Sequence, residues 1–213
     1  MTKAFVSYHH ANDQVYKEHL AYLAKCFGAF EDCSVEVGEI DDDRSSESIR
    51  TTIRDNYLRD SEVTILLCGT ETRFRKHIDW ELKSSMINGT KNKQSGILVI
   101  DLPTTSCTTW HAGLHGEHKQ IYWDYCGSWI NIESKSQYRA RYPDLPERII
   151  DNLNNAHVAM SVVPWHKIKN QPENLRFLVN ATAVAGRSNQ YDTSLPMKRK
   201  NYNPKPAYNL RFG

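Results

Sequence analysis

Two continuous apolar runs limit the fold more than any other feature of this sequence. "VTILLC" at 63–68 and "GILVIDL" at 96–102 are rich in β-branched and aliphatic residues and show no apolar–polar alternation. Such runs are typical of strands that are covered on both faces, as in a parallel sheet between two layers of helices. "KAFVSY" at 3–8 is a shorter run of the same kind. Together they predict an α/β protein with a mostly parallel sheet.

Helical patterns lie between these strands. One runs to Phe27, with Asn12 or Asp13 as its cap and Gly28 as its stop. Further helices are expected within 45–61, around 77–88, behind Pro146, and from near Pro172 to Gly186. This alternation of strands and helices indicates βαβ units with right-handed crossovers.

Two weaker segments complete the sheet. "SVEV" at 34–37 predicts a half-buried second strand, and "HVAMSVVPW" at 157–165 predicts a fifth. About five strands favour the flavodoxin-like order, in which the first and third strands flank the topological switch point.

The domain organisation follows from where this regularity stops. Residues 1–186 are expected to form one α/β domain, interrupted at about 103–145 by a long aromatic-rich insertion that covers the sheet edge or makes a partner surface. Residues 187–213 form a basic extension with three prolines, which favours a disordered or loosely docked segment. A nucleic-acid arm is the alternative.

The composition limits the expected partners and the expected cellular compartment. A net charge of +2 in 213 residues makes nucleic acid an unlikely partner. The sequence has no secretory signal and no run of about 18 apolar residues, so no membrane association is expected. The five cysteines are widely spaced and form no CxxC pair, which favours reduced thiols in the cytoplasm.

Polar segments follow the first three expected strands. They read "SYHHAND", "GEIDDDR" and "GTETRFRKHIDWE". Because ligands of open α/β sheets bind beyond the carboxyl ends of the strands, we expect these segments to converge on one crevice with Glu81 at its edge.

Three of these features together resemble a known family. "AFVSYHHANDQ", the acidic loop after the second strand and "WE" on the helix after the third resemble the TIR-like domains of bacterial Thoeris antiphage systems, in the TIR superfamily. The resemblance covers roughly residues 3–165. One departure is His77, at a position where such domains often have a second tryptophan.

The resemblance implies an enzyme that cleaves NAD at the nicotinamide–ribose bond and makes a cyclic ADP-ribose isomer as a second messenger. NAD would be the substrate, with no cofactor and no metal. The implied partners are a separate effector reached through the diffusible product, a phage-derived trigger and a second copy of the chain. Two alternatives stay open: a non-catalytic TIR scaffold that signals by self-association, and a nucleotide-binding module without turnover.

Glu81 is the expected catalytic carboxylate. Nicotinamide leaves an oxocarbenium-like ribose and needs no general acid, so a single carboxylate suffices to stabilise the positive charge and accept hydrogen bonds from the ribose hydroxyls. The alternative is an ordinary solvated glutamate near a helix N-terminus.

Other residues are candidates for substrate binding. Ser7, Tyr8 and His9 are expected at the ribose or pyrophosphate, with Tyr8 stacking on a ring, although Ser7 and Tyr8 could instead satisfy local backbone groups. Trp80 either lines the pocket or belongs to the core.

Two charged segments are also candidates. Asp42, in the acidic run 41–43, is a substrate contact or gate if it is not merely part of a solvated loop. Arg75, with Arg73, could bind phosphates through its bidentate fork or could lie on the surface.

The histidines of "WHAGLHGEH" do not predict a metal site. His111, His115 and His118 would align on a helix, but Gly113 and Gly116 disfavour that helix. No cysteine or carboxylate completes a convincing ligand set.

Overall fold

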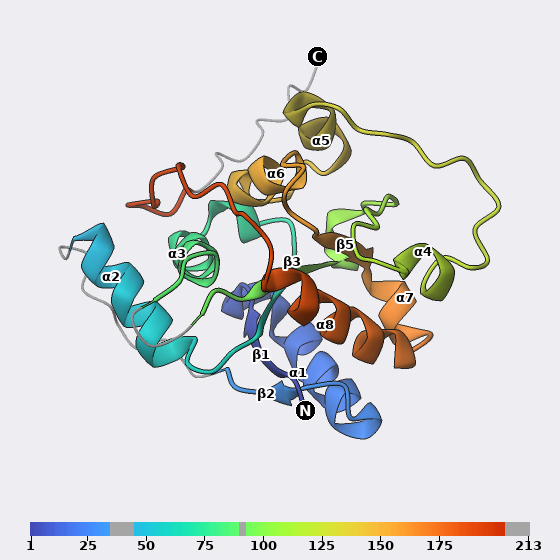
Figure 1. The fold of residues 1–213 in the computed structure, drawn as a ribbon, viewed down its shortest axis with the longest axis horizontal. Helices are drawn as coiled ribbons and strands as arrows, with labels where there is room; N and C mark the ends of the chain where they lie inside the picture. The colour runs from blue at the N-terminus through green and yellow to red at the C-terminus, as the bar shows by residue number, and fades with distance from the viewer. Residues whose placement is uncertain (35–44, 90–92, 203–213) are drawn as a thin grey trace, which may run out of the picture.

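The computed structural model describes residues 1–34, 45–89 and 93–202. Within them lies a five-stranded, all-parallel sheet of order β2-β1-β3-β4-β5 (Figure 1), which confirms the flavodoxin-like α/β fold. The strands are β1 (Lys3–Ser7), β2 (Glu31–Asp32), β3 (Val63–Cys68), β4 (Gly96–Asp101) and β5 (Ser161–Pro164).

The second strand is not where the sequence predicted it. β2 pairs with β1 through Glu31 and Asp32, and Ser34 lies beyond its end, while 35–37 are outside the described residues. The Ser34 hydroxyl oxygen accepts a hydrogen bond from the Val6 amide at 2.8 Å. A side chain therefore takes the place that backbone pairing was expected to fill.

Helices cover both faces of the sheet. One layer contains α1 (His10–Phe27), α7 (Trp165–Lys169) and α8 (Glu173–Gly186). The other contains α2 (Ser46–Thr52), which continues into the π-helical η1 (Ile53–Tyr57), with α3 (Lys76–Ser85) and α6 (Glu147–Leu153). A short 3-10 turn, η2 (Thr72–Phe74), precedes α3. The helices expected from the sequence are therefore present, with ends shifted by a few residues.

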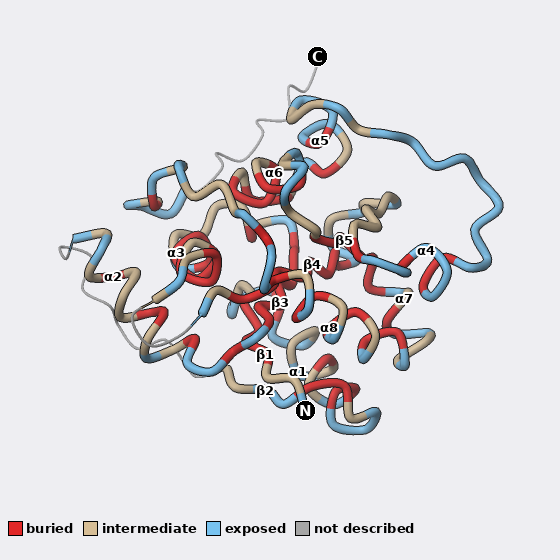
Figure 2. Tube along the Cα trace, viewed as in Figure 1, coloured by how far each residue is buried: buried red, intermediate tan, exposed pale blue. Residues whose placement is uncertain are grey.

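Alternate residues of the apolar strands pack against the two helix layers. Ile65 and Leu67 of β3 face the core beside α1 and α8, whereas Leu66 and Cys68 face the core beside α3 and α6. All six residues of β3 are buried, and the buried strands form the centre of the tube in Figure 2. The side-chain period of two therefore explains why neither face of this strand is polar.

Gly28 ends α1 as expected. It adopts the left-handed conformation with φ 57°, and its amide donates to the carbonyl oxygen of Ala24. The start of the helix differs from the prediction, because α1 begins at His10 and Asp13 lies inside its first turn.

The insertion covers the β5 edge of the sheet. His111 forms an antiparallel bridge with Val162, with both backbone N–H···O distances 2.9 Å. The insertion also contains η3 (Pro103–Thr105), α4 (Glu117–Gln120) and α5 (Lys135–Arg141). The connection from α4 to α5 is mostly exposed, as its pale blue colour in Figure 2 shows.

Residues 191–202, here called the C-terminal strap, lie against α3 and α6 rather than apart from the domain. Lys83 Nζ donates to the Leu195 carbonyl at 3.0 Å, Arg148 donates to the same carbonyl at 3.0 Å, and Met197 is buried. The expected disordered or loosely docked extension is thus not what the structure has over this part. A polar, proline-containing segment can dock here because its backbone carbonyls bind side chains that the domain supplies.

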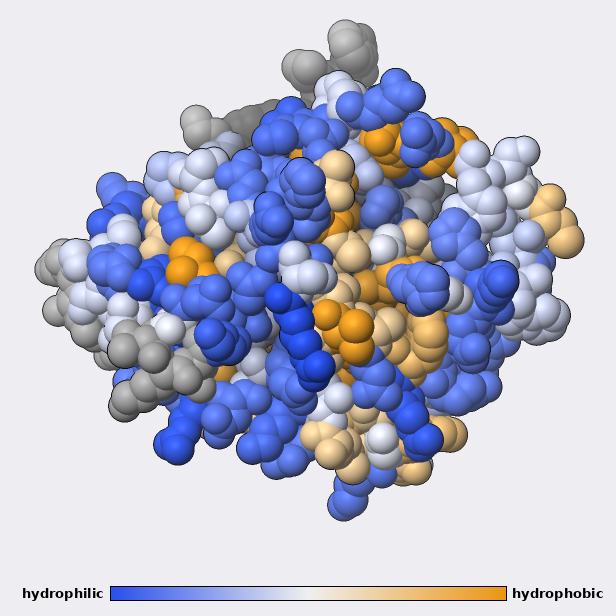
Figure 3. All heavy atoms as spheres, viewed as in Figure 1, coloured by the Kyte–Doolittle hydropathy of each residue, from blue (hydrophilic) through white to orange (hydrophobic). Residues whose placement is uncertain are grey.

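Among the described residues, no helix is long and apolar enough to cross a membrane. On the face shown in Figure 3, hydrophobic side chains reach the surface in several separate places, one of them over α8, with hydrophilic side chains around them.

Candidate functional site

Glu81 lies beside the carboxyl end of β1. Its Oε2 atom accepts a hydrogen bond from the Ser7 hydroxyl at 2.6 Å, and none of the described residues donates to Oε1. Ser7 is the last residue of β1, and Glu81 is on α3, which follows the adjacent strand β3. The structure therefore brings together two of the sequence-predicted site residues at the predicted edge of the sheet.

The environment of Glu81 is drier than the open crevice that the sequence suggested. Its side chain is buried, and desolvation raises its pKa to about 7, although the Ser7 hydrogen bond lowers it. Near neutral pH the carboxyl is therefore divided between its charged and neutral forms. A carboxyl with this behaviour beside one serine is a candidate for acid–base or electrostatic chemistry.

Asp13 is a second buried carboxyl nearby in the fold. It is on α1, 2% exposed, and desolvation raises its pKa to about 6 against a backbone hydrogen bond from His9. A Cβ atom at Gly69, just beyond β3, would lie 2.7 Å from the Asp13 carboxylate. A larger residue at position 69 would therefore require the Asp13 side chain to shift. Sequence reasoning treated Asp13 only as a cap, although it is part of the quoted "SYHHAND" segment.

His9 lies between the end of β1 and the first residue of α1. Its Nδ1 is buried without a hydrogen-bond partner, 3.9 Å from Glu71 Oε2 and too far for a hydrogen bond. Burial, then the positive charge of Arg75, lowers the pKa of His9, so the imidazole is neutral at pH 7. A neutral imidazole with an open nitrogen can accept a proton.

Arg75 is already paired. Its guanidinium forms an ion pair with Glu71, four residues earlier, so any contact with a phosphate would have to compete with that carboxylate. Arg73 donates to the Pro143 carbonyl and lies 4.5 Å from the Phe74 ring centroid. The structure gives both arginines roles within the protein.

Tyr8 is oriented by its neighbours. Its hydroxyl donates to Gln14 Oε1 at 2.7 Å, and its ring stacks on His10 with a centroid distance of 4.4 Å. One face of the ring is therefore occupied, which limits stacking on a substrate to the other.

Trp80 belongs to the core. It is 1% exposed, its indole N–H donates to the Lys198 carbonyl at 2.7 Å, and His77 meets its ring edge-on at 5.0 Å. Successive residues on a helix point about 100° apart. Trp80 thus packs against the C-terminal strap while its neighbour Glu81 meets Ser7, which explains why the two stand side by side.

The remaining predictions concern Asp42 and the histidines of the insertion. Asp42 lies outside the described residues. His111 is in the bridge to β5, and His118 lies on α4 with its ring against Trp129. Within 1–34, 45–89 and 93–202, no group of three histidine, cysteine or acidic side chains could hold a metal ion.

The sequence was also compared with known protein families. Residues 5–106, just under half of the chain, match the family model for the TIR-like domain of Thoeris protein ThsB. Over these residues the chain is similar to the TIR-like domain of Thoeris protein ThsB. No curated protein matches the sequence. The ThsB model spans β1 to η3 and so includes Ser7, Asp13 and Glu81. This similarity supports a role in antiphage defence.

Proposed function

We propose that this protein is a TIR-like enzyme that cleaves NAD at the nicotinamide–ribose bond and closes the remaining ADP-ribose into a cyclic isomer. The observation that carries the proposal is the Glu81 carboxyl at the β1–β3 switch point, fixed by Ser7 through one oxygen and with the other free of described donors. A protein that signalled only by self-association would have no use for this arrangement.

In the first step the bond between ribose C1′ and the nicotinamide nitrogen breaks. Its electron pair stays on the ring nitrogen, so nicotinamide leaves neutral and needs no proton. Positive charge develops on the ribose, and the ionised Glu81 carboxylate, preorganised by Ser7, stabilises it. The effect is large because the side chain is shielded from water.

In the second step a hydroxyl of the same ADP-ribose attacks C1′ and gives up its proton. The balance is NAD⁺ to nicotinamide, cyclic ADP-ribose and H⁺. The neutral imidazole of His9, with Nδ1 unpartnered, suits the proton acceptor. Ring closure rather than hydrolysis requires that water be excluded, which the burial of Glu81 favours.

The substrate has to reach a side chain that is only 7% exposed. The groups that cover Glu81 must therefore move before NAD binds. A closed resting state fits an enzyme that acts only after a phage-derived trigger, and the product would then carry the signal to a separate effector.

The test is to measure small molecules by mass spectrometry. Purified protein is incubated with NAD and extract from phage-infected cells, and nicotinamide, linear ADP-ribose and cyclic isomers are quantified. We expect nicotinamide and a cyclic isomer in equal amounts. If linear ADP-ribose were the only other product, the reaction would be hydrolysis and not cyclisation. If no nicotinamide formed under any condition, the self-associating scaffold would be the better explanation.

A further inference from the structure

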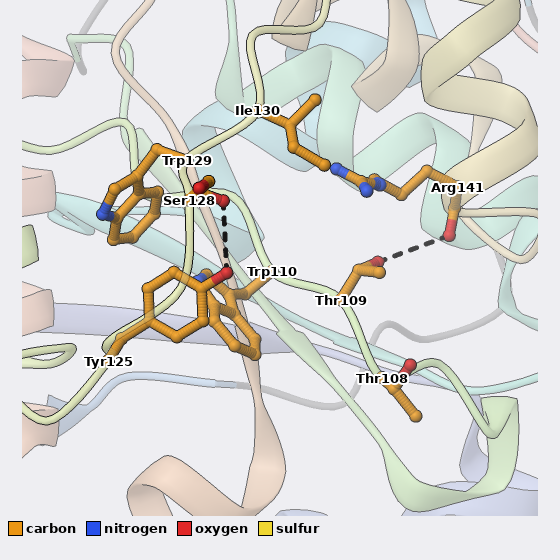
Figure 4. Close-up of a pocket in the computed structure, with 8 residues that line it drawn as sticks. All are labelled: Thr108, Thr109, Trp110, Tyr125, Ser128, Trp129, Ile130 and Arg141. Carbon is orange, nitrogen blue, oxygen red and sulfur yellow. Dashed lines mark hydrogen bonds between the residues drawn. The ribbon is translucent and has the colours of Figure 1, made fainter.

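The insertion contains a cavity that the proposed reaction does not use. It has a volume of about 180 Å³, and Figure 4 shows its lining: Thr108, Thr109, Trp110, Tyr125, Ser128, Trp129, Ile130 and Arg141. None of these residues is acidic. The cavity lies among the segment after η3, the α4–α5 connection and the end of α5.

One side of the cavity is aromatic. The Trp110 and Tyr125 rings meet edge-to-face with centroids 5.2 Å apart, and Tyr125 meets Trp129 in the same way at 5.3 Å. Trp110 is held in place by Tyr122, which stacks on it at 5.1 Å with 12° between the ring planes. Tyr125 is fixed by its hydroxyl, which donates to the Ser128 carbonyl at 3.2 Å. The rings are thus positioned by their neighbours before any ligand arrives.

The other side carries an uncommitted positive charge. In Figure 4 the Arg141 guanidinium extends toward Ile130, across the cavity from the rings. Over residues 1–34, 45–89 and 93–202 it has no hydrogen-bond or ion-pair partner, whereas Arg139 on the same helix is paired with Glu147. The backbone of Arg141 is anchored, since its carbonyl accepts from Thr109 Oγ1 at 3.5 Å.

The size of the cavity selects a small ligand. About 180 Å³ corresponds to roughly six water molecules and is below the roughly 300 Å³ at which sites for drug-sized ligands begin. It is large enough for one planar ring system. Aromatic walls favour a flat heterocycle, and a free guanidinium favours a phosphate.

A peptide fits this place less well. Extended peptides add to exposed sheet edges, and the outer edge of β5 is already paired with His111. We propose that the cavity is a second nucleotide site, in which a base lies against Trp110 and Trp129 and its phosphate binds Arg141.

The test uses the full chain and AMP as the probe, because AMP has no nicotinamide bond to cleave. Calorimetry should give one saturable site. Because stacking and a charge-assisted phosphate contact each contribute to affinity, Trp129→Ala and Arg141→Gln should each weaken binding about tenfold or more. Trp129→Phe keeps a ring and should retain most of the affinity.

Matched controls lie in the same segments. Trp123→Ala removes a neighbouring indole that is 69% exposed and outside the cavity, and Arg139→Gln removes the same charge from the same helix. Both should bind AMP as the wild type does, and so should Glu81→Gln. Adenosine and ribose 5-phosphate, each lacking one half of the probe, should bind much more weakly than AMP.

Several results would overturn the assignment. They are no saturation with AMP at millimolar concentration, unchanged affinity in both Trp129→Ala and Arg141→Gln, or loss of binding in Glu81→Gln, which would move AMP to the other site. Thermal unfolding of each variant separates a binding defect from a folding defect. Failure of NAD cleavage would not affect any of these measurements.

Discussion

Glu81 and Glu117 are alike in almost every local property, although they lie in different parts of the molecule. Both are buried, and desolvation raises the pKa of each to about 7. Each also accepts a hydrogen bond from a serine of the sheet: Ser7 at the end of β1 for Glu81, and Ser161 at the start of β5 for Glu117.

The difference lies in the second carboxylate oxygen. Glu117 Oε2 accepts the Leu114 amide at 3.0 Å, so both of its oxygens are used, one by the insertion and one by β5. Glu81 has one oxygen without a described donor and stands at the carboxyl edge of the sheet, where α/β proteins bind ligands. Burial and a raised pKa therefore do not separate a structural carboxyl from a reactive one, whereas an unused oxygen and its position do.

The largest difference is expected in catalysis. Glu81→Gln keeps the size of the side chain but removes the charge that stabilises the ribose cation, so NAD cleavage should fall on the order of a hundredfold to a thousandfold. Glu117→Gln should cleave NAD at the wild-type rate. Nicotinamide release by triggered protein measures both. Equal rates in the two variants would remove the distinction between the glutamates.

For folding stability we expect the opposite order, with the larger loss on substitution of Glu117. Glu117→Ala leaves the Leu114 amide and the Ser161 hydroxyl without their buried acceptor, which costs about 1–3 kcal/mol. Glu81→Gln should change the free energy of unfolding less, because its carbonyl oxygen can still accept from Ser7. Chemical denaturation of the two variants and the wild type provides the comparison. A larger loss in Glu81→Gln would mean that Glu81 is the more important structural residue.

The pH dependence gives a third comparison. Each carboxyl has a pKa raised from 4.5 to about 7, so its stabilising contribution is complete below pH 4.5 and is lost as the pH rises through about 7. Relative to either Gln variant, the wild type should therefore lose stability over this window. NAD cleavage needs ionised Glu81 and should increase with pH through about 7 in wild type and Glu117→Gln alike. A flat profile would exclude Glu81 as the titrating group.

Removing the serines should have smaller effects. The Ser7 hydrogen bond lowers the pKa of Glu81, so Ser7→Ala should move the activity profile to higher pH while leaving appreciable activity at alkaline pH. Ser161→Ala should leave the profile in place. Rates measured across the pH range on both variants check this, and a shift in Ser161→Ala would show that the insertion is coupled to the site.

Chelation should have the smallest effect. Treatment with a metal chelator is expected to change neither the melting temperature nor product formation. The same result is expected for the Glu81 and Glu117 variants. Stoichiometric zinc in the purified protein would contradict this and would direct attention back to His111 and His118.

The sequence predicted correctly those features that a local residue pattern determines. The uninterrupted runs at 63–68 and 96–102 became β3 and β4 because residues buried on both faces need no polar alternation. Gly28 ended a helix because few other residues adopt its backbone conformation. The convergence of Ser7 and Glu81 followed from strand order alone.

What the sequence missed depends on contacts between distant residues. Trp80 was ambiguous because its partner, the Lys198 carbonyl, is 118 positions away. The docking of the strap rests on the backbone carbonyls of Leu195 and Pro196, which leave no trace in residue type. The approach of Asp13 to Gly69 likewise depends on how the first turn of α1 meets the end of β3 and not on either segment alone.

The strap also fixes how α3 is turned about its own axis. Asp79 accepts the Lys198 amide at 2.8 Å and forms a buried ion pair with Arg148, and Trp80 donates to Lys198, so two sides of the helix are held. A side chain about 5–6 Å from a helix axis moves roughly 1 Å for a rotation of about 10°. Displacements of that size can change a reaction rate about a hundredfold. A shift of the strap that turned α3 would therefore also displace the Glu81 carboxylate on the other side of the helix.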